Sequence, residues 1–395
     1  MMDTTKWVQL SEIAALITKG TTPTTIGFDF QDTGINFLKI ECFSEDGAFI
    51  EKKVAHISEG CHEKLKRSQL EEGDILFSIA GAIGRVAVVM KEMLPANTNQ
   101  ALAIIRIRRK DVYLPYIKLI LTSPIVKTQF ERKKQGVAQL NISLKDINEL
   151  EIPLLTINKQ IEYASLFDKV SRIIVARKQQ LQKLDELIKS RFVEMFGDVI
   201  HNEKGWQQHS FSEITSSRLG KMLDAKQQTG LHSYPYLANF NVQWFRFELK
   251  TLNQMDFNEA DRVEFALQDG DVLVCEGGEI GRCAVWHNEI QPCFFQKALH
   301  RVRCNKSIIL PDYLAWWFKY NCDHGGFAAI EGAKATISHL PGAKLKQLQV
   351  TVPPISHQER FAAFVAEVDK SKLAVKQSLE KLETLKKSLM QQYFG

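Results

Sequence analysis

The chain has 395 residues, of which 45% are apolar and 25% charged, and its formal net charge is +5. This is the composition of a globular protein with two to three domains, each long enough to bury its own core. No run approaches the ~20 apolar residues of a membrane helix, and the N-terminal MMDTTKWVQL lacks the basic start and apolar core of a secretory signal, so we expect a cytoplasmic protein without a membrane segment.

Residues 1–155 have the pattern of a mixed, strand-rich domain. A short helix is expected over Leu10 to Thr18, followed by a turn-rich loop from Lys19 to Pro23. The segment from Leu70 to Val89 predicts a turn, a strand, a glycine loop and a return strand, because β-branched runs bracket its glycines. Further along, we expect a strand at 101–107 and a helical stretch at 113–130 that Pro124 interrupts.

Residues 156–197 change in character and predict one long helix of roughly 40 residues, because neither Gly nor Pro occurs between Asn158 and Phe196. Apolar residues recur at spacings of three and four if Arg177 and Arg191 occupy two positions of the same stripe. Gly197 is expected to cap the C-terminus of the helix.

The end of this helix occurs twice in the chain. KQQLQKLDELIKSRFVEMFG (178–197) and KQSLEKLETLKKSLMQQYFG (376–395) align without a gap at an offset of 198 residues. Residues 198–352 likewise repeat the first domain: Leu267 to Val285 matches the Leu70 segment, and Ile337-Ser338 is taken to match Ile142-Ser143. A second helix is expected in 353–395, with Ser356 and Glu359 forming a capping box after Pro353-Pro354.

The predicted architecture is domain, long helix, domain, long helix. An apolar stripe on a long helix needs a partner, and the nearest candidate is its own repeat; two copies related by an approximate two-fold axis would pack the helices antiparallel. Residues 158–197 carry eight Lys or Arg against five Asp or Glu, a net of +3. A two-fold, basic object suggests duplex DNA with two half-sites. The charge alone favours a solvated coiled-coil face, and it is the repeat of the fold that favours DNA.

The duplicated layout, the "GD-I/V-L … G-x-I-G-R" segments and the helices that close on "F-G" resemble the specificity (S) subunit of type I restriction-modification systems. The resemblance covers nearly the whole chain. The segments 220–225, 236–247 and 275–282 look like a common subtype of recognition domain, whereas residues 19–60 depart from it. The implied fold class is α+β: two repeated mixed α/β target-recognition domains (1–155 and 198–352) separated by two long antiparallel coiled-coil spacer helices (156–197 and 353–395), with a pseudo-two-fold relation.

The resemblance implies that each domain reads one half of a split sequence in double-stranded DNA. It also implies that the spacer helices set the gap and bind modification methyltransferase subunits, two in number, and that a restriction subunit joins them. S-adenosylmethionine and ATP/Mg are expected only in those partners, with no cofactor and no metal in this chain. The spacer and partner contacts are assigned to apolar residues of both helices: Leu181, Leu184, Ile188, Leu379, Leu382 and Leu389.

The residues themselves do not suggest catalysis. There is no Asn/Asp-Pro-Pro-Tyr/Phe methylation motif, no phosphate-binding G-x-x-x-x-G-K-[ST] loop and no zinc-protease helix. The seven cysteines form no C-x-x-C pair and are odd in number, which indicates reduced, mostly buried thiols. The competing hypothesis is a coiled-coil scaffold with two domains that bind ligands other than DNA.

Candidate DNA-binding residues fall into four groups. Arg85 and Arg282 follow loop glycines and suit a phosphate or guanine, or else hold the hairpin through an ion pair. Asn239, Asn241, Gln243 and Arg246 are placed on a strand that either contacts DNA or is a polar edge. The other two groups are loops that either hold phosphates or are solvated turns, namely Lys19, Thr21, Thr22 and Lys221, and Gln135, Asn141, Ser143, Lys334, Thr336 and Ser338. The run Trp316-Trp317-Phe318 is expected in the core rather than as a base-stacking platform.

Overall fold

The computed structural model describes residues 6–45, 47–132, 142–224, 228–327 and 339–395. The chain divides into two compact units, each of which combines distant parts of the sequence. Unit 1 comprises residues 1–178 and 377–395, and unit 2 comprises residues 179–376. Among the helices of the described residues, none is both long and apolar enough to cross a membrane.

Unit 1 is built on a four-stranded antiparallel sheet in the order β2-β8-β5-β6, a three-stranded sheet β4-β3-β7 and a two-stranded ribbon β1-β9. Its strands are β1 (Lys6–Gln9), β2 (Leu16–Lys19), β3 (Ile35–Leu38), β4 (Ala55–Ile57), β5 (Ile75–Ser78), β6 (Val86–Val88), β7 (Ala96–Thr98), β8 (Leu102–Arg106) and β9 (Glu151–Leu154). Its shorter helices are α1 (Leu10–Ile13), α2 (Glu59–Lys64), α3 (Leu114–Leu121), α4 (Pro124–Arg132) and α5 (Leu144–Asn148).

Unit 2 repeats the three sheets in the same order, as β11-β19-β16-β17, β15-β12-β18 and β10-β20, and adds the hairpin β13-β14. Its strands are β10 (Gln207–Ser210), β11 (Thr215–Leu219), β12 (Ser233–Leu237), β13 (Val242–Gln243), β14 (Arg246–Phe247), β15 (Asn253–Asp256), β16 (Val272–Cys275), β17 (Cys283–Val285), β18 (Phe294–Phe295), β19 (Leu299–Cys304) and β20 (Gln349–Val352). Its shorter helices are α7 (Phe211–Ile214), α8 (Glu259–Glu264), α9 (Pro311–Asp323) and α11 (Gly342–Gln347).

Most of the predicted local elements are confirmed. The strand, glycine loop and return strand appear as β5-β6 and β16-β17, and Pro124 begins α4 where the interruption is expected. The helix expected over Leu10 to Thr18 is wrong, because α1 has only four residues and Leu16 to Lys19 form β2. Leu16 pairs with Arg106 and Lys19 with Ala103, so a partner strand far along the chain overrides the local pattern.

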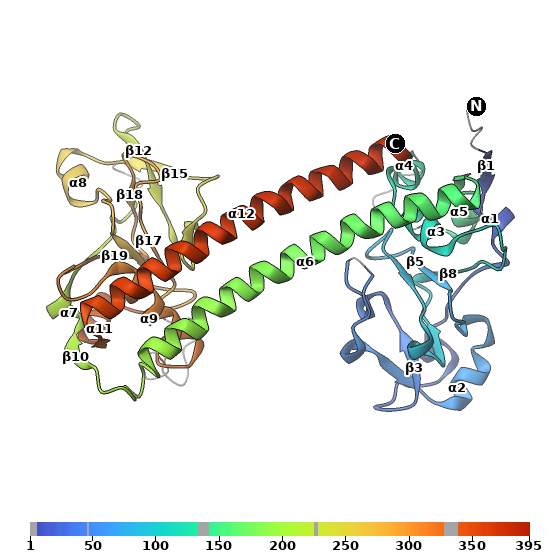
Figure 1. Cartoon of the computed structure of the whole chain (residues 1–395), viewed down its shortest axis with the longest axis horizontal. Helices are drawn as coiled ribbons and strands as arrows, with labels where there is room; N and C mark the ends of the chain where they lie inside the picture. The colour runs from blue at the N-terminus through green and yellow to red at the C-terminus, as the bar shows by residue number, and fades with distance from the viewer. Residues whose placement is uncertain (1–5, 46, 133–141, 225–227, 328–338) are drawn as a thin grey trace. The chain divides into compact units, whose positions relative to one another are not determined.

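The two long helices α6 (Ile157–Phe196) and α12 (Ile355–Phe394) have 40 residues each and run unbroken in Figure 1. In unit 1, the ring of Tyr163 near the start of α6 packs on Tyr393 at the end of α12, with centroids 4.4 Å apart. In unit 2, Phe192 near the end of α6 packs on Phe361 near the start of α12, at 5.5 Å. In both units the two helices therefore pack antiparallel, as predicted.

The ends of α6 and α12 confirm one prediction and correct another. Gly197 has φ +72° and its N–H donates to the carbonyl of Val193 at 2.8 Å, which is the cap expected of it. The capping box at Ser356 is wrong, because α12 already begins at Ile355 and Ser356 lies inside it. The carbonyl of Pro354 accepts the N–H of His357 at 2.9 Å instead.

Both long helices are tied to their own domain by a glutamine in the first turn. The Oε1 of Gln160 accepts the N–H of Tyr113 at 2.8 Å, and its Nε2 donates to the carbonyls of Asp111 and Leu155 at 3.0 and 2.8 Å. The other glutamine, Gln358, repeats this set in unit 2: it accepts from Leu310 at 2.8 Å and donates to Ile308 and Pro353 at 2.9 and 2.8 Å. Both side chains are buried, so these bonds are shielded from water.

The cysteines match the expected reduced state. All seven are free; five are buried and two are partly exposed. Burial raises the pKa of Cys275 to about 11 and that of Cys293 to about 12. The described residues hold no group of His, Cys, Asp or Glu side chains arranged to bind a metal ion.

Candidate nucleic-acid interface

In unit 2, four segments that are far apart in sequence meet at one end of the main sheet. We call them the loop cluster: the turn after β11 (220–222), the β16-β17 loop (276–282), the β18-β19 turn (296–298) and the short 3₁₀ turn Asn239–Asn241. Backbone bonds join them, from the N–H of Lys297 to the carbonyl of Lys221 at 2.8 Å and from Glu276 to Ala298 at 2.9 Å. The Nδ2 of Asn239 donates to the carbonyl of Gly277 at 2.9 Å, so hydrogen bonds connect all four segments.

Unit 1 holds the equivalent loop cluster, formed by residues 20–22, 79–85, 99–101 and the 3₁₀ turn Ile40–Cys42. The N–H of Thr21 donates to Thr98 at 3.1 Å and that of Ile79 to Ala101 at 2.9 Å. Both bonds recur in unit 2, from the N–H of Lys221 to the carbonyl of Phe295 at 3.2 Å and from Glu276 to Ala298 at 2.9 Å, so the two units share this part of the backbone framework. Several of these loops carry candidate residues predicted from the sequence in both domains, and the structure brings those segments together.

A glycine under each turn makes this close approach possible. A Cβ atom on Gly20 would lie 2.0 Å from the carbonyl oxygen of Thr98, and one on Gly220 would lie 2.3 Å from the carbonyl group of Gln296. Those distances are too short for any side chain, so only glycine fits. The strand end and the turn are therefore locked together in each unit.

Arg85 and Arg282 both point back onto the framework. Arg85 donates from Nη1 to the carbonyl of Phe43 at 3.3 Å. Arg282 donates from Nη2 to the carbonyl and the side-chain Oδ1 of Asn239 at 3.2 and 3.0 Å, and lies 3.6 Å from Glu279. Each arginine therefore connects its hairpin to the adjacent 3₁₀ turn, Arg85 through a backbone carbonyl and Arg282 through Asn239, and Arg282 also lies near the carboxylate of Glu279.

The strand predicted through Asn239, Asn241, Gln243 and Arg246 is wrong at its beginning. Asn239 and Asn241 form a 3₁₀ turn, and only the latter two residues lie on the short β13-β14 hairpin. Asn241 is fully buried; its Oδ1 accepts from Ala238 at 2.9 Å, and its Nδ2 donates to the carbonyls of Glu248 and Thr251.

The four residues consequently differ in what they offer to a ligand. Asn241 is a structural side chain of the turn, so the DNA contact predicted for it is not supported. The side chain of Asn239 accepts a hydrogen bond from Arg282 and donates one to the carbonyl of Gly277. The side chain of Gln243 donates to the carbonyl of Phe240 at 2.9 Å. The side chain of Arg246 is exposed and has no hydrogen-bond or ion-pair partner within the described parts of the chain.

In the loops after β2 and β11, some side chains are hydrogen-bonded within the protein and others are not. Lys221 is mostly buried and donates to Asp261 and to the carbonyl of Asp256, at 2.6 and 2.7 Å. Thr21 is half-buried, and Thr22 donates from Oγ1 to Gln100. Lys19 ends β2 and is half-buried, with no ion-pair partner among the residues that the structure covers.

The polar loop ahead of each long helix is described only in part. Ser143 caps α5: its Oγ accepts the N–H of Asp146 at 3.1 Å. The other predicted residues of these loops, Gln135, Asn141, Lys334, Thr336 and Ser338, lie outside the described residues.

The equivalence drawn between Ile142-Ser143 and Ile337-Ser338 is wrong by three residues. Ile142 donates its N–H to Ile79, and the same bond in unit 2 runs from Leu340 to Glu276. Pro341 therefore holds the place of Ser143 as the cap of the next helix. The imidazole of His300 is buried and makes a 3.0 Å hydrogen bond from Nε2 to the carbonyl of Leu340, and burial lowers its pKa.

Two exposed side chains at the centre of the loop clusters are not among the residues predicted from the sequence, namely Gln100 in unit 1 and Lys297 in unit 2. Each lies at the middle of the turn that enters the central strand β8 or β19. An alignment of the two halves around the shared Ala-Leu that follows each residue would have revealed the matching positions.

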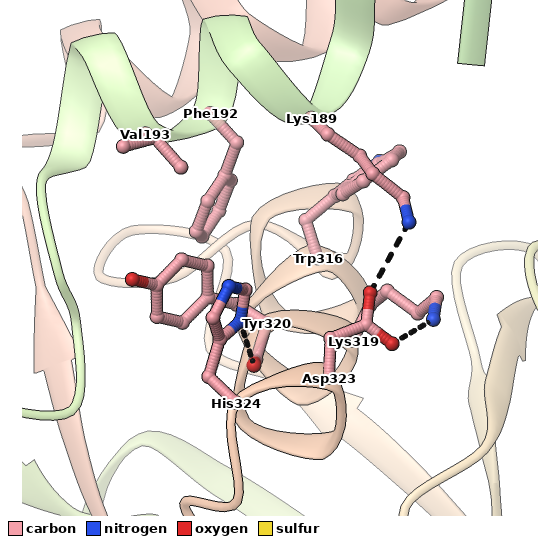
Figure 2. A pocket seen from close by; sticks show the side chains of 8 residues that line it. All are labelled: Lys189, Phe192, Val193, Trp316, Lys319, Tyr320, Asp323 and His324. Atoms are coloured by element: carbon pink, nitrogen blue, oxygen red, sulfur yellow. Dashed lines mark hydrogen bonds and ion pairs between the residues drawn. The ribbon is translucent and has the colours of Figure 1, made fainter. Parts of the chain in front are cut away.

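The tryptophan run of α9 belongs to the core, as expected, with Trp316, Trp317 and Phe318 all buried. Figure 2 shows a small pocket beside Trp316, between the last turns of α6 and α9. Phe192 covers its apolar side, and Asp323 accepts from Lys189 at 3.3 Å and from Lys319. The pocket lies where α6 packs on α9 in unit 2, and no residue of the loop cluster lines it.

The predicted spacer residues lie at different depths. Ile188 is buried in the core of unit 2, while Leu184 and Leu389 pack at the margins of the unit 2 and unit 1 cores. Leu181, Leu379 and Leu382 are half-buried. Both helices also expose apolar side chains at repeated positions: Val175 and Leu373 are 42% and 57% exposed, and Leu187 and Leu385 are 47% and 46% exposed.

Comparison with known proteins gives concordant matches. The chain is 32% identical over 138 residues to the type I restriction enzyme EcoBI specificity subunit of Escherichia coli, covering 34% of this chain and 28% of that one. It is 23% identical over 176 residues to the putative type I restriction enzyme MjaX specificity subunit of Methanocaldococcus jannaschii, covering 44% and 41%. The chain thus aligns with less than half the length of either relative.

Two solved structures share the fold. A chain from a study of complex assembly in a type I R-M system matches with a TM-score of 0.64 at 16% identity, covering 98% of this chain and 96% of that one. The type I restriction-modification S subunit of M. genitalium matches with a TM-score of 0.54 at 14% identity, covering 100% and 98%.

One family model matches the chain twice, over residues 2–186 and 203–385, and it is described as the type I restriction modification DNA specificity domain. Each match covers one set of three sheets together with most of the long helix that follows it. With both halves matched, the chain belongs to the type I restriction-modification specificity family and carries two copies of its DNA specificity domain.

Proposed function

We propose that this chain is a non-catalytic DNA-recognition subunit. In this proposal, each unit presents its loop cluster to one half of a bipartite duplex sequence, and the long helices set the gap between the half-sites. The main support is that the two loop clusters share a backbone framework but carry different exposed side chains. A common framework with different side chains suits two half-sites of different sequence.

The partners belong to the same proposal. Modification methyltransferase subunits, two in number, would bind the helices, and a restriction subunit would join them; those partners would bring S-adenosylmethionine and ATP/Mg. The repeated exposed apolar side chains support this assignment, because Leu187 and Leu385 occupy the same position in the two halves. Apolar side chains exposed on both helices are suited to burial by a partner protein.

A domain exchange tests this function. Residues 198–352 are replaced with the corresponding domain of a divergent family member, and methylated adenines are mapped genome-wide in cells that contain the modification partner. One half of the methylated motif is expected to change while the other half stays the same. An unchanged motif would contradict the assignment of specificity to this domain.

Duplex binding by the purified complex provides a second measurement. Because contacts to phosphates release counterions, the logarithm of the affinity should fall linearly as the logarithm of the salt concentration rises. Affinity that does not respond to salt would favour the competing scaffold with ligands other than DNA.

A further inference from the structure

One exposed position of each loop cluster, the centre of the turn before the central strand, has backbone hydrogen bonds on both sides. In unit 1 the N–H of Leu102 closes this turn on the carbonyl of Asn99 at 3.3 Å, and in unit 2 that of Leu299 closes it on Gln296 at 3.2 Å. The following residue, Ala101 or Ala298, accepts a bond from the adjacent hairpin at 2.9 Å in both units. The backbone on each side of the central residue is therefore held in place.

The side chains at this position differ in kind. Gln100 and Lys297 are both exposed. The side-chain ammonium of Lys297 carries a positive charge and has no hydrogen-bond or ion-pair partner among the described residues, whereas the side chain of Gln100 offers a neutral amide. The residue two positions after the turn glycine also differs between the units. It is Thr22 after Gly20 in unit 1 and Met222, which is 65% exposed, after Gly220 in unit 2.

The arginines of the cluster behave in the opposite way. Arg85 and Arg282 are the same residue in both units, and both are bonded to carbonyls of their own framework. A residue that is identical in two domains cannot distinguish two different half-sites. The position of Gln100 and Lys297 is better suited to that task. Its side chain differs between the units and is exposed, and its backbone is held in place, as precise recognition requires.

We infer that Gln100 and Lys297 read base edges in the major groove, Gln100 at an adenine and Lys297 at a guanine. This inference rests on the proposed function and assigns specificity to one position in each unit. A glutamine amide matches the N6 and N7 atoms of adenine, and a lysine ammonium matches the O6 and N7 atoms of guanine.

Thr22 acts as a positioning residue for Gln100. Its Oγ1 donates to the Oε1 of Gln100, which fixes the orientation of the amide. The Oε1 atom keeps a second lone pair for the N6 amino group of adenine, and Nε2 remains free to donate to N7. The amide is therefore oriented for adenine before DNA arrives.

The test uses the full chain assembled with its modification partner and a library of duplexes that varies every base of the methylated motif. Lys297→Gln should abolish the preference for guanine at one position, changing the affinity ratio between bases there by about tenfold or more. Lys297→Arg should retain that preference. Lys250→Gln, which removes an exposed charge from a loop outside the cluster, is the matched control and should leave every position unchanged.

The outcomes separate the possibilities. If Lys297→Gln weakens binding to all duplexes equally and lowers the salt slope by about one, the lysine contacts a phosphate and the inference is overturned. An unchanged base preference also overturns it. A wild-type complex that binds duplexes with no sequence preference instead contradicts the proposed function itself.

In unit 1, Gln100→Ala should remove the preference for adenine at one position of the other half-site. Thr22→Val should reduce this preference without removing it, because the amide persists but loses its orienting bond, and Thr22→Ser should restore it. Equal preference in wild type and Gln100→Ala would refute the assignment in this unit. Loss of binding to every sequence by Thr22→Val would assign it a structural role instead.

Discussion

At the scale of single residues, the two units share a charged pair that the sequence analysis overlooked. Asp74 has a fully buried side chain and accepts from Arg106 at two bonds of 2.7 Å. In unit 2 Asp271 is 2% exposed and accepts from Arg303 at 2.8 and 3.3 Å. Each carboxylate also accepts a backbone N–H in the turn before its hairpin. The pair thus holds the hairpin strand against the central strand.

Removing the arginine leaves a buried charge without its partner. Arg106→Met should lower the free energy of unfolding by about 3 kcal/mol or more. Arg303→Met should cost less, because the Arg303 side chain is 35% exposed, compared with 14% for Arg106, and water screens the pair more. Denaturant unfolding measures both variants.

Arg108→Met is the control for these variants. Arg108 is 67% exposed and pairs with Glu71 at 2.8 Å, so its loss should change stability by about 0–1 kcal/mol. A cost for Arg108→Met as large as that for Arg106→Met would mean that burial does not determine the strength of these pairs.

At the scale of elements, the long helices depend on their first turns. Gln160 and Gln358 each satisfy one backbone N–H and two carbonyls of the neighbouring loop and of the chain entering the helix. These bonds connect the direction of each helix to the sheet domain before it. Nothing in the local helical pattern predicts this, because a glutamine is an ordinary helix residue.

Gln160→Ala should lower the free energy of unfolding by about 2–4 kcal/mol, because three backbone groups lose buried partners. Gln358→Ala should have a similar effect in unit 2. Hydrogen exchange resolved by peptide should show faster exchange at the loop residues 111–113 in the first variant. Gln179 is an exposed glutamine on the same helix, so the free energy of unfolding of Gln179→Ala should stay within about 0.5 kcal/mol of the wild-type value. Equal losses of stability in Gln160→Ala and Gln179→Ala would contradict the anchoring role of Gln160.

At the scale of the molecule, each unit is completed by a helix from the other half of the sequence. Phe394, the last helical residue of α12, is 1% exposed and packs on Tyr116, Tyr163 and Phe167 of unit 1. In unit 2 its repeat Phe196 is fully buried and packs on Tyr313 at 4.9 Å. The repeated "F-G" ends of the helices are therefore core elements of the two units.

Phe394→Ala should destabilise unit 1 by about 3–5 kcal/mol and leave unit 2 largely unaffected, whereas Phe196→Ala should do the reverse. Hydrogen exchange, measured separately over residues 6–132 of unit 1 and 228–327 of unit 2, shows which unit each variant destabilises. Leu385→Ala, 46% exposed on the same helix as Phe394, should change little in either region. If Phe394→Ala loosened unit 2 as much as unit 1, the division into two compact units would be wrong.

The elements that sequence analysis predicted correctly are those with a local signal. The hairpins at 70–89 and 267–285 follow from apolar runs around glycines, and α6 follows from apolar spacing without Gly or Pro. The local pattern of β2 predicts a helix, because only its pairing with β8 makes it extended. The DNA contact predicted for Asn241 fails for a similar reason, because its burial depends on carbonyls seven and ten residues further along the chain.

The sequence alone determined the duplicated domain-and-helix layout, the family resemblance and the absence of the catalytic motifs sought, because these are recorded in residue identity and spacing. Only the tertiary structure decided which loops meet, which polar side chains are committed to the framework and that Gln100 and Lys297 occupy matching exposed positions. The reason is physical: periodicity and capping act within a few residues, whereas burial and hydrogen bonding between distant segments decide which side chains remain available to a ligand.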